Sequence, residues 1–149
     1  MNNFRSGMSY LSESTGSWPG LEFIVSYSSY LVSSPSEMVE GSGSIYKYGV
    51  SVDYPLVLPS NCLVELLITS EDVIHSWTVE GLGVKCDAIP GRINSAYINN
   101  MRPGYTAWGG CSEMCGVNHW QMSAQLEVLS QKDFYQWALC MVYLSMKEQ

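Results

Sequence analysis

The sequence predicts an all-β domain, a barrel or sandwich of short strands, preceded by an irregular arm and followed by one helix. Three features of the 149-residue chain carry this prediction. Residues 21–130 alternate between runs of aromatic and β-branched residues and short turns rich in Gly, Pro, Asn and Asp, as in a small all-β fold. Residues 1–20 are rich in Ser, Gly and Asn, and residues 131–149 change to helical spacing.

The composition describes a single domain whose surface carries few charges. Hydrophobic residues make up 46% of the chain and charged residues only 14%, which is low for a domain that stands alone in water. We therefore expect partners to cover much of the surface. The net charge of −7 disfavours nucleic acid and suits the docking of a basic protein, although mild acidity also serves solubility alone.

Two strands are expected before residue 53. Leu21 to Val32 has the aromatic and β-branched content of a strand, and Ser33 to Ser44 is a mostly polar loop. Ile45 to Val52 alternates between two faces, which indicates a half-buried strand. Asp53 to Ser60 then has the pattern of a turn followed by a third strand.

Further strands follow in quick succession. Leu63 to Thr69 is an apolar run broken only by one glutamate, and Val73 to Val79 brings His75 and Trp77 to one face, because residues two apart on a strand point the same way. We expect Trp77 to pack in the core. The remaining expected segments are two short pieces with turns between Gly81 and Arg92, a strand from Arg92 to Asn99, a turn at Arg102–Gly104, a strand ending at Cys111 and a closing strand from Gln121 to Leu129.

The C-terminal segment predicts a helix. Ser130 followed by Asp133 resembles a capping box, with Asp in place of the usual Glu. A helical stripe follows, and it is apolar enough to dock either on a neighbour or on the barrel of its own chain. Its members are Phe134, Trp137, Ala138, Met141 and Leu144.

The stretch Gly110 to Met122, GCSEMCGVNHWQM, holds the chemistry of the chain. It places the thiols of Cys111 and Cys115 four residues apart, and the imidazole of His119 and the thioether of Met122 follow within seven more residues. Soft sulfur together with imidazole is the ligand set that selects copper. A mononuclear blue-copper centre uses one cysteine, so the second cysteine indicates two metals that share two thiolates.

A dinuclear site of this kind needs one imidazole for each metal, and the loop supplies only one. The other histidine of the chain is His75, at the start of a predicted strand. Two alternatives stay open: a Cys111–Cys115 disulfide, and a histidine at position 75 that is simply satisfied in the core. The other cysteines are expected to be small buried residues. They are Cys62, Cys86 and Cys140.

These residues carry a resemblance to a known family. The loop C-S-E-M-C-G-V-N-H-x-x-M resembles the CuA loop of cytochrome c oxidase subunit II, and the run from Ser70 to Asn94, SEDVIHSWTVEGLGVKCDAIPGRIN, resembles the same family. The resemblance covers Val50 to Val128 well and both flanks weakly. It implies a cupredoxin-like Greek-key barrel, in agreement with the strand pattern.

The resemblance also implies a ligand for each position. Cys111 and Cys115 would bridge two copper ions, the CuA centre, and His75 and His119 would each bind one of them. Met122 would be a weak axial ligand. Glu113 would give its backbone carbonyl to copper, and its side chain would reach a magnesium ion shared with subunit I. The alternative for the Glu113 side chain is a solvated loop acid.

The function implied by the resemblance is electron entry into a haem–copper terminal oxidase. The chain would accept single electrons from cytochrome c and pass them to haem a in subunit I, as a subunit of the enzyme that does not itself reduce oxygen. By the same resemblance, Phe23 stands where the family has an electron-entry tryptophan, and acidic residues would dock cytochrome c. The acids are Glu71, Asp72 and Asp87. A core aromatic at position 23 and merely solvated acids are the alternatives.

The sequence contains no apolar run long enough to span a bilayer and no positively charged leader before an apolar stretch. Members of the family usually begin with a transmembrane helical hairpin. We therefore expect a split subunit whose helices lie on a separate chain, together with other respiratory-complex subunits. The expected location is the mitochondrial inner membrane, with the domain facing the intermembrane space, and a bacterial periplasmic face is the alternative.

Two other functions remain open. A copper domain of the nitrous oxide reductase type has the same metal core, but it carries a bulky aromatic at the position of Glu113 and a large extra domain. A copper chaperone or thiol oxidoreductase would use the cysteine pair and one histidine. It would not need Met122, and it would predict a thioredoxin-like alternation of strands and helices that this sequence lacks.

Overall fold

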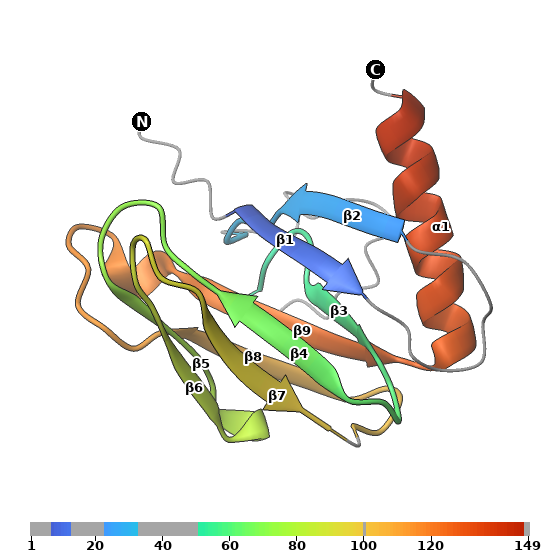
Figure 1. The fold of residues 1–149 in the computed structure, drawn as a ribbon, viewed down its shortest axis with the longest axis horizontal. Coiled ribbons are helices and arrows are strands. Elements are labelled where there is room, and N and C mark those ends of the chain that lie inside the picture. Colours follow the sequence, from blue (N-terminus) through green and yellow to red (C-terminus); the bar gives the residue numbers. More distant parts are fainter. Residues whose placement is uncertain (1–6, 13–22, 33–50, 100, 148–149) are drawn as a thin grey trace.

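The computed structural model describes residues 7–12, 23–32, 51–99 and 101–147, and it contains nine strands and one α-helix there (Figure 1). The bounds are β1 Gly7–Ser12, β2 Phe23–Ser28, β3 Leu56–Pro59, β4 Val64–Ile68, β5 His75–Val79, β6 Val84–Ala88, β7 Asn94–Ile98, β8 Thr106–Cys111, β9 Ser123–Leu129 and α1 Gln131–Lys147. Two single-turn 3-10 helices, η2 (Glu80–Leu82) and η3 (His119–Gln121), follow β5 and precede β9.

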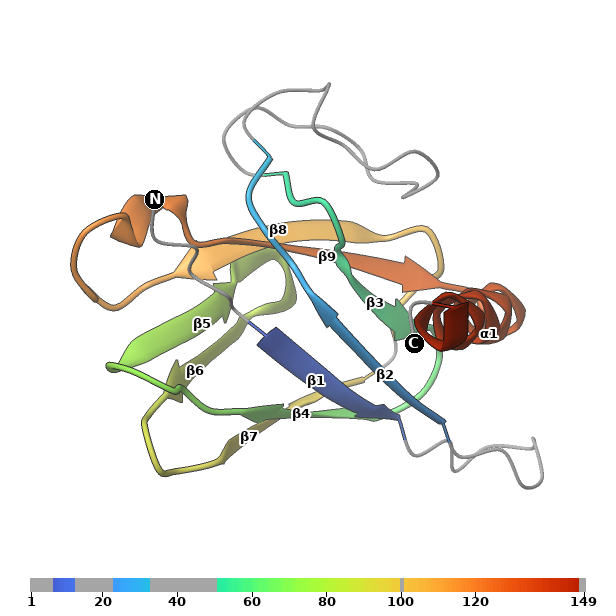
Figure 2. The same ribbon diagram turned by 90° about the horizontal axis from the view of Figure 1, so that it is seen from above.

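The strands form one large sheet and two small ones. The five-stranded sheet has the order β3-β9-β8-β5-β6, in which β3 runs parallel to β9 and the other neighbours are antiparallel. β4 pairs with β7 and closes the barrel opposite the large sheet, and β1 pairs with β2 (Figures 1 and 2). The expected all-β barrel with a C-terminal helix is therefore confirmed.

The core lies between the β4–β7 pair and the large sheet. Leu126 of β9 and Val79 of β5 are fully buried, and Leu66 of β4 and Ile98 of β7 face them in the same cluster. Trp77 of β5 belongs to this cluster, as expected, so the strand that carries His75 is anchored from its buried face. Trp77 thus holds β5 in the core, and His75, two residues earlier on the same face, lies at the end of the strand beside the loop.

Helix α1 begins as the sequence predicts. The backbone N–H of Asp133 donates to Ser130 Oγ at 3.2 Å, and the Ser130 hydroxyl donates to the Asp133 carboxylate at 2.6 Å. Ala138 is fully buried, and the helix contacts β2, β3 and β9, so its first half docks on its own barrel. Leu144, at the end of the predicted stripe, is exposed. Among the described residues, no helix combines the length and apolar character that crossing a membrane requires.

The N-terminal region differs from the expectation. Residues 7–12 form β1, although the arm that contains them was predicted to be irregular. These six residues are a strand because they pair antiparallel with β2. The local composition of the arm does not encode this pairing. The rest of the arm lies outside the described residues, as does most of the strand expected at 45–52. Of that strand only Ser51 and Val52 are described, and Val52 forms a bridge with Leu31.

Candidate metal centre

Two neighbouring strands and one loop position the candidate ligands. β5 begins at His75 and β8 ends at Cys111, and the antiparallel pairing of Trp77 with Cys111 brings these two strand ends together. Cys115 lies in the loop between β8 and β9, and His119 begins η3 in the same loop. A ligand 36 residues away in the chain is thus delivered to the loop by strand pairing.

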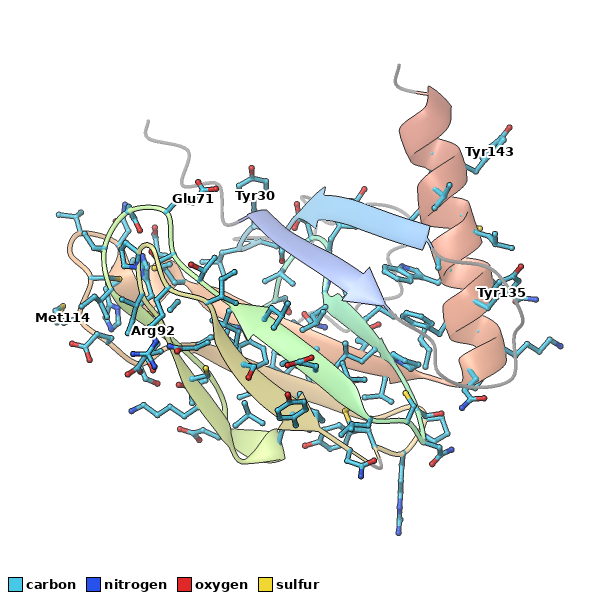
Figure 3. The ribbon with its side chains drawn as sticks, viewed as in Figure 1. Tyr30, Glu71, Arg92, Met114, Tyr135 and Tyr143 are labelled. Atoms are coloured by element: carbon cyan, nitrogen blue, oxygen red, sulfur yellow. The ribbon has the colours of Figure 1, made fainter. Side chains whose placement is uncertain are left out.

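The loop forms one end of the molecule. In Figure 3, Met114 lies at the tip of the loop, and Glu71 and Arg92 lie at the same end. Tyr135 and Tyr143 of α1 lie at the opposite end. The candidate ligands are therefore remote from helix α1.

Each cysteine of the loop has one histidine beside it. The Sγ atom of Cys111 lies 3.7 Å from Nδ1 of His75, and the Sγ atom of Cys115 lies 3.2 Å from Nδ1 of His119. The two Sγ atoms are 3.9 Å apart, whereas a disulfide bond is about 2.05 Å long. The structure thus contains two free thiols in place of the alternative disulfide, each with its own imidazole.

The other two predicted ligands also divide between the cysteines. The Sδ atom of Met122 lies 3.4 Å from Sγ of Cys115, and the backbone carbonyl oxygen of Glu113 lies 3.2 Å from Sγ of Cys111. The structure therefore brings together all six atoms that the sequence predicts as metal ligands. The side chain of Glu113 is exposed at the same end of the barrel.

The spacing of these atoms suits metal ions. Two ligands of one tetrahedral ion, with sulfur at roughly 2.3 Å and nitrogen at roughly 2.0 Å, lie about 3.5 Å apart. The sulfur–nitrogen distances of 3.2 and 3.7 Å bracket this value. His75, Cys111 and Cys115 also form a group whose ligand atoms all lie within 4.8 Å of one another. Thiolate, thioether and imidazole in one cluster fit copper better than a hard cation.

The two thiols differ in acidity. Burial opposes ionisation of Cys111, but hydrogen bonds from the backbone near Ser76 and Glu113 and from His75 outweigh it and lower the pKa of this thiol. Burial and the neighbouring Cys111 raise the pKa of Cys115. Cys111 is therefore the more acidic thiol of the pair, and a metal bound by both thiolates would have to displace the proton of Cys115 as well.

His75 has a carboxylate on its far side. Its Nε2 atom lies 2.8 Å from Oδ1 of Asp72, three residues earlier in the turn before β5. Partial burial of His75 opposes its protonation, but the hydrogen bonds with Asp72 and Cys111 outweigh burial and raise the pKa of the imidazole. The same hydrogen bond with His75 lowers the pKa of Asp72.

Backbone hydrogen bonds fix the loop at both ends. The N–H of Cys111 donates to the carbonyl of Met122 at 3.1 Å, and the N–H of Ser112 donates to the carbonyl of Ser76 at 2.8 Å. Ser76 is itself buried, and its hydroxyl donates to the carboxylate of Asp87 at 2.7 Å. Sequence reasoning assigned Asp87 only to docking and did not identify Ser76, because neither hydrogen bond has a local sequence signature.

The predicted docking residues differ in what surrounds them. Glu71 is exposed, whereas the carboxylates of Asp72 and Asp87 are hydrogen-bonded to β5. Phe23 is the first residue of β2 and pairs with Ser12, and its side chain lies outside the described residues. The acids thus gather at the end of the barrel that holds the candidate ligands, but only Glu71 lacks a described bond to the β5 region.

A rim of exposed apolar side chains surrounds the candidate ligands, and sequence reasoning did not identify it. It comprises Val73, Ile74, Met114, Val117 and Trp120, with exposed fractions from 46% to 87%. Its signal in the sequence is the presence of large apolar residues in segments predicted to be turns and loops. Several large exposed apolar side chains in the segments around one site indicate contact with another molecule.

The remaining cysteines lie away from the loop. Cys62 and Cys86 are partly buried, and burial raises the pKa of both thiols. Cys140 on α1 is exposed, so the expectation of a small buried residue is wrong there. Its position explains the difference, because it follows Leu139 on the outer face of a helix whose inner face carries Ala138.

Fold and site together define a cupredoxin-like domain with a cysteine-rich metal loop between two adjacent strands. The sequence model of "Cytochrome C oxidase subunit II, periplasmic domain" matches residues 10–129. The chain therefore belongs to the cytochrome c oxidase subunit II family. Membership implies copper binding, and the donor atoms described above fit copper.

Two solved structures extend this result. The periplasmic domain of subunit II of cytochrome oxidase (CoxB) of Bradyrhizobium japonicum is 27% identical, with a TM-score of 0.69 over 91% of this chain and 85% of that one. The mixed-disulfide intermediate between the thioredoxin-like protein TlpAs and subunit II of cytochrome c oxidase is 28% identical. Its TM-score is 0.62 over 79% of this chain and 75% of that one. This chain thus shares its fold with domains of oxidase subunit II.

Proposed function

We propose that this chain is the electron-entry subunit of a haem–copper terminal oxidase, and that it holds a dinuclear CuA centre. It would accept single electrons from cytochrome c and pass them to haem a in subunit I. The observation that supports this most directly is the pairing of two free thiols, 3.9 Å apart, with one imidazole each. A mononuclear site would leave one of these thiols without a ligand role.

The proposed ligands follow from the distances between donor atoms. Cys111 and Cys115 would hold two copper ions as shared thiolate ligands, and His75 and His119 would each bind one of the ions. When bound, a thiolate-bridged copper pair stores one electron with little change in bond lengths, which keeps the barrier to transfer low. The chain itself supplies rigidity, because both ends of the loop are fixed by backbone hydrogen bonds to neighbouring strands.

The weaker ligands divide between the same two ions. Met122 would be a weak ligand of one ion, and the backbone carbonyl of Glu113 would bind the other. The exposed Glu113 carboxylate would then reach a magnesium ion shared with subunit I, because carboxylates and water are the ligands that magnesium prefers. We expect from this arrangement that a variant lacking either cysteine still folds but no longer holds its copper.

The partners follow from charge and from the apolar rim. Glu71, Asp72 and Asp87 would attract basic cytochrome c to an acidic chain, with Phe23 as a candidate electron-entry aromatic. The exposed Met114, Val117 and Trp120 would be covered by subunit I and its neighbours. We further propose that the domain faces the mitochondrial intermembrane space or a bacterial periplasm.

Electron paramagnetic resonance of the copper-loaded chain, with copper counted on the same sample, tests this proposal. Hyperfine structure from one electron shared equally by two copper nuclei is expected, together with its loss in Cys111→Ser and Cys115→Ser. Retention of two coppers and an unchanged spectrum in either variant would contradict the bridged site. A single copper per chain with one-nucleus hyperfine structure would favour a blue-copper or chaperone function.

A second activity of the same cysteines is supported by the 3.9 Å between their Sγ atoms and by the similar subunit II domain that forms a mixed disulfide with a thioredoxin-like protein. We propose that a Cys111–Cys115 disulfide, formed when another disulfide takes two electrons from the copper-free thiols, is reduced by a thioredoxin-like dithiol before copper is loaded. One thiolate of the reductant attacks the disulfide to give a mixed disulfide, and its second thiol releases the reduced pair as the reductant becomes oxidised. Trapping of the mixed disulfide with a single-cysteine reductant is the test, and its absence under conditions that reduce a control peptide would exclude the step.

A further inference from the structure

We infer that Asp72 is a positioning residue of the metal centre: by accepting the Nε2–H of His75, it directs the Nδ1 lone pair of this imidazole toward the metal. The inference rests on the proposed function, because it concerns one of the proposed copper ligands. It assigns Asp72 a role that docking of a basic partner does not require. The two roles predict different effects for substitutions at adjacent acidic positions.

The contacts on the two sides of the imidazole support this role. Nε2 of His75 lies 2.8 Å from Oδ1 of Asp72, and Nδ1 lies 3.7 Å from Sγ of Cys111. A neutral imidazole carries its proton on one nitrogen and a lone pair on the other. With the proton on Nε2, the ring donates to the carboxylate and leaves Nδ1 free to bind a metal. With the proton on Nδ1, the lone pair of Nε2 would face a carboxylate oxygen across 2.8 Å, which is repulsive.

The fold fixes the backbone of His75, and this limits how far the imidazole ring can move away from Asp72. His75 is the first residue of β5 and pairs with Ala88, and Trp77, two residues later, is held in the core. Asp72 lies in the turn immediately before the strand, where its N–H donates to Ser70 Oγ at 3.3 Å. The Ser70 hydroxyl also lies 3.0 Å from Oδ1 of Asp72. Both the ring and the carboxylate are therefore anchored by the chain before any metal binds.

The two imidazoles of the centre are unequal in this respect. Within the described part of the chain, no carboxylate accepts a hydrogen bond from Nε2 of His119, whereas Nε2 of His75 has Asp72 as its partner. A carboxylate on the far side of a ligating imidazole fixes its tautomer and makes it a stronger donor to the metal. The ion held by His75 is thus the one whose oxidised form Asp72 stabilises, and loss of this carboxylate should raise the reduction potential of the centre.

Three variants of the full chain separate positioning from charge. Asp72→Ala removes both the acceptor and the charge, and Asp72→Asn keeps an acceptor oxygen but removes the charge. Glu71→Gln is the matched control, because it removes one negative charge at the adjacent exposed position, where no hydrogen bond to the site is described. If Asp72 acted only through surface charge, Asp72→Asn and Glu71→Gln would behave alike and Asp72→Ala would add nothing to Asp72→Asn.

The first readout needs no metal. Nitrogen-15 NMR of the reduced, copper-free chain, at a pH where both imidazoles are neutral, reports the tautomer of each of the two histidines. We expect the Nε2–H tautomer for His75 in the unmodified chain and in Glu71→Gln, largely the same tautomer in Asp72→Asn, and a mixture in Asp72→Ala. His119 should be unchanged in all four proteins. If the ratio of the two His75 tautomers were the same in Asp72→Ala as in the unmodified chain, the inference would be overturned.

The second readout is the reduction potential of the copper-loaded chain. Removal of such a partner typically weakens metal binding by about 10–100-fold. If the loss falls on the oxidised form alone, a tenfold change corresponds to a rise of about 59 mV for one electron. We expect this rise in Asp72→Ala, a smaller rise in Asp72→Asn and almost none in Glu71→Gln. Equal rises in Asp72→Ala and Glu71→Gln would contradict positioning.

Failure of the inference and failure of the proposed function are distinguishable. A dinuclear spectrum in the unmodified chain, with potential and tautomer unaffected by Asp72→Ala, would keep the function and discard the role of Asp72. A spectrum from a single copper would discard the dinuclear function, whereas the tautomer of His75 in copper-free protein would still decide whether Asp72 orients the ring.

Discussion

Two methionines of the metal loop show how far one residue's surroundings determine its role. Met122 lies with its sulfur 3.4 Å from Cys115 and is half-buried, whereas Met114 is 77% exposed at the tip of the loop. Both are thioethers on the same segment between β8 and β9. Only Met122 is placed to act as a weak ligand, so the sulfur of Met114 has no role in the centre.

Met122→Leu should leave copper bound and raise the reduction potential, because a sulfur donor that stabilises oxidised copper is lost. Voltammetry of the copper-loaded chain measures the shift, and copper analysis of the same sample measures retention. Met114→Leu is the matched control and should leave the potential unchanged. An equal potential in Met122→Leu and the unmodified chain would argue against axial ligation by Met122.

At the same scale, the sequence indicates the candidate ligands better than the residues that hydrogen-bond to them and to their neighbours. Four candidate ligands could be chosen because they lie close together in the sequence at a spacing that suits a metal, and His75 followed because the chain has a single other histidine; the structure brings all five side chains together. The bond from Asp72 to His75 could not be predicted, because an acid three residues before a histidine fits docking equally well. The bond from Asp87 to Ser76 joins two strands and depends on their register.

At the scale of elements, the close approach of β5 and β8 sets the site. A side chain at Gly109 would begin 1.9 Å from the carbonyl oxygen of Thr78 and 2.9 Å from the Cα atom of Val79. No side chain fits there, so glycine is required for the two strands to pair. This pairing is what brings His75 beside Cys111, two residues beyond Gly109.

Gly109→Ala should therefore separate the two strands and destabilise the fold by about 1–3 kcal/mol or more, as overpacking of a closed interior does. Copper uptake should fall with it, because the strand ends carry ligands. Urea unfolding measures the free energy, and absorbance titration measures uptake. Gly110→Ala is the graded comparison, since its added carbon would lie 3.0 Å from the carbonyl of Met122 and should cost less. Equal stability of Gly109→Ala and the unmodified chain would contradict the close approach.

Elements defined by local pattern were predicted, and those defined by distant pairing were not. The capping box before α1 and the sequence patterns of β4, β5 and β9 are local, and the structure contains all four elements close to their expected bounds. β1 was expected to be irregular, because its Ser- and Gly-containing sequence has weak strand character by itself. It becomes a strand through its pairing with β2, which the sequence does not encode within either segment.

At the scale of the whole molecule, the fold disfavours the charged form of one carboxylate. Glu127 on β9 is half-buried between strands, and burial raises its pKa above the usual 4.5, although a hydrogen bond from Gln125 opposes the shift. The folded chain therefore binds this proton more tightly than the unfolded chain. The stabilising contribution is complete below pH 4.5 and is lost as pH rises through the higher folded-state pKa.

Glu127→Gln should raise the melting temperature at pH 7, where the ionised carboxylate is disfavoured in the fold, and the difference should vanish near pH 4. Differential scanning calorimetry of both proteins across this range checks the sign. The exposed Glu80→Gln is the control and should change stability by no more than about 0.5 kcal/mol at either pH. A lower melting temperature for Glu127→Gln at pH 7 would show that the hydrogen bond from Gln125 outweighs burial.

The apolar rim and the outer face of α1 lie at opposite ends of the molecule (Figure 3). Val117 and Trp120 are exposed at one end, and Leu139, Tyr143 and Leu144 at the other. A copy made in excess of its partners would thus expose apolar side chains at both ends, and such copies would associate end to end into filaments. A cell that makes this protein therefore has to match its supply to that of its partners, or remove the surplus quickly.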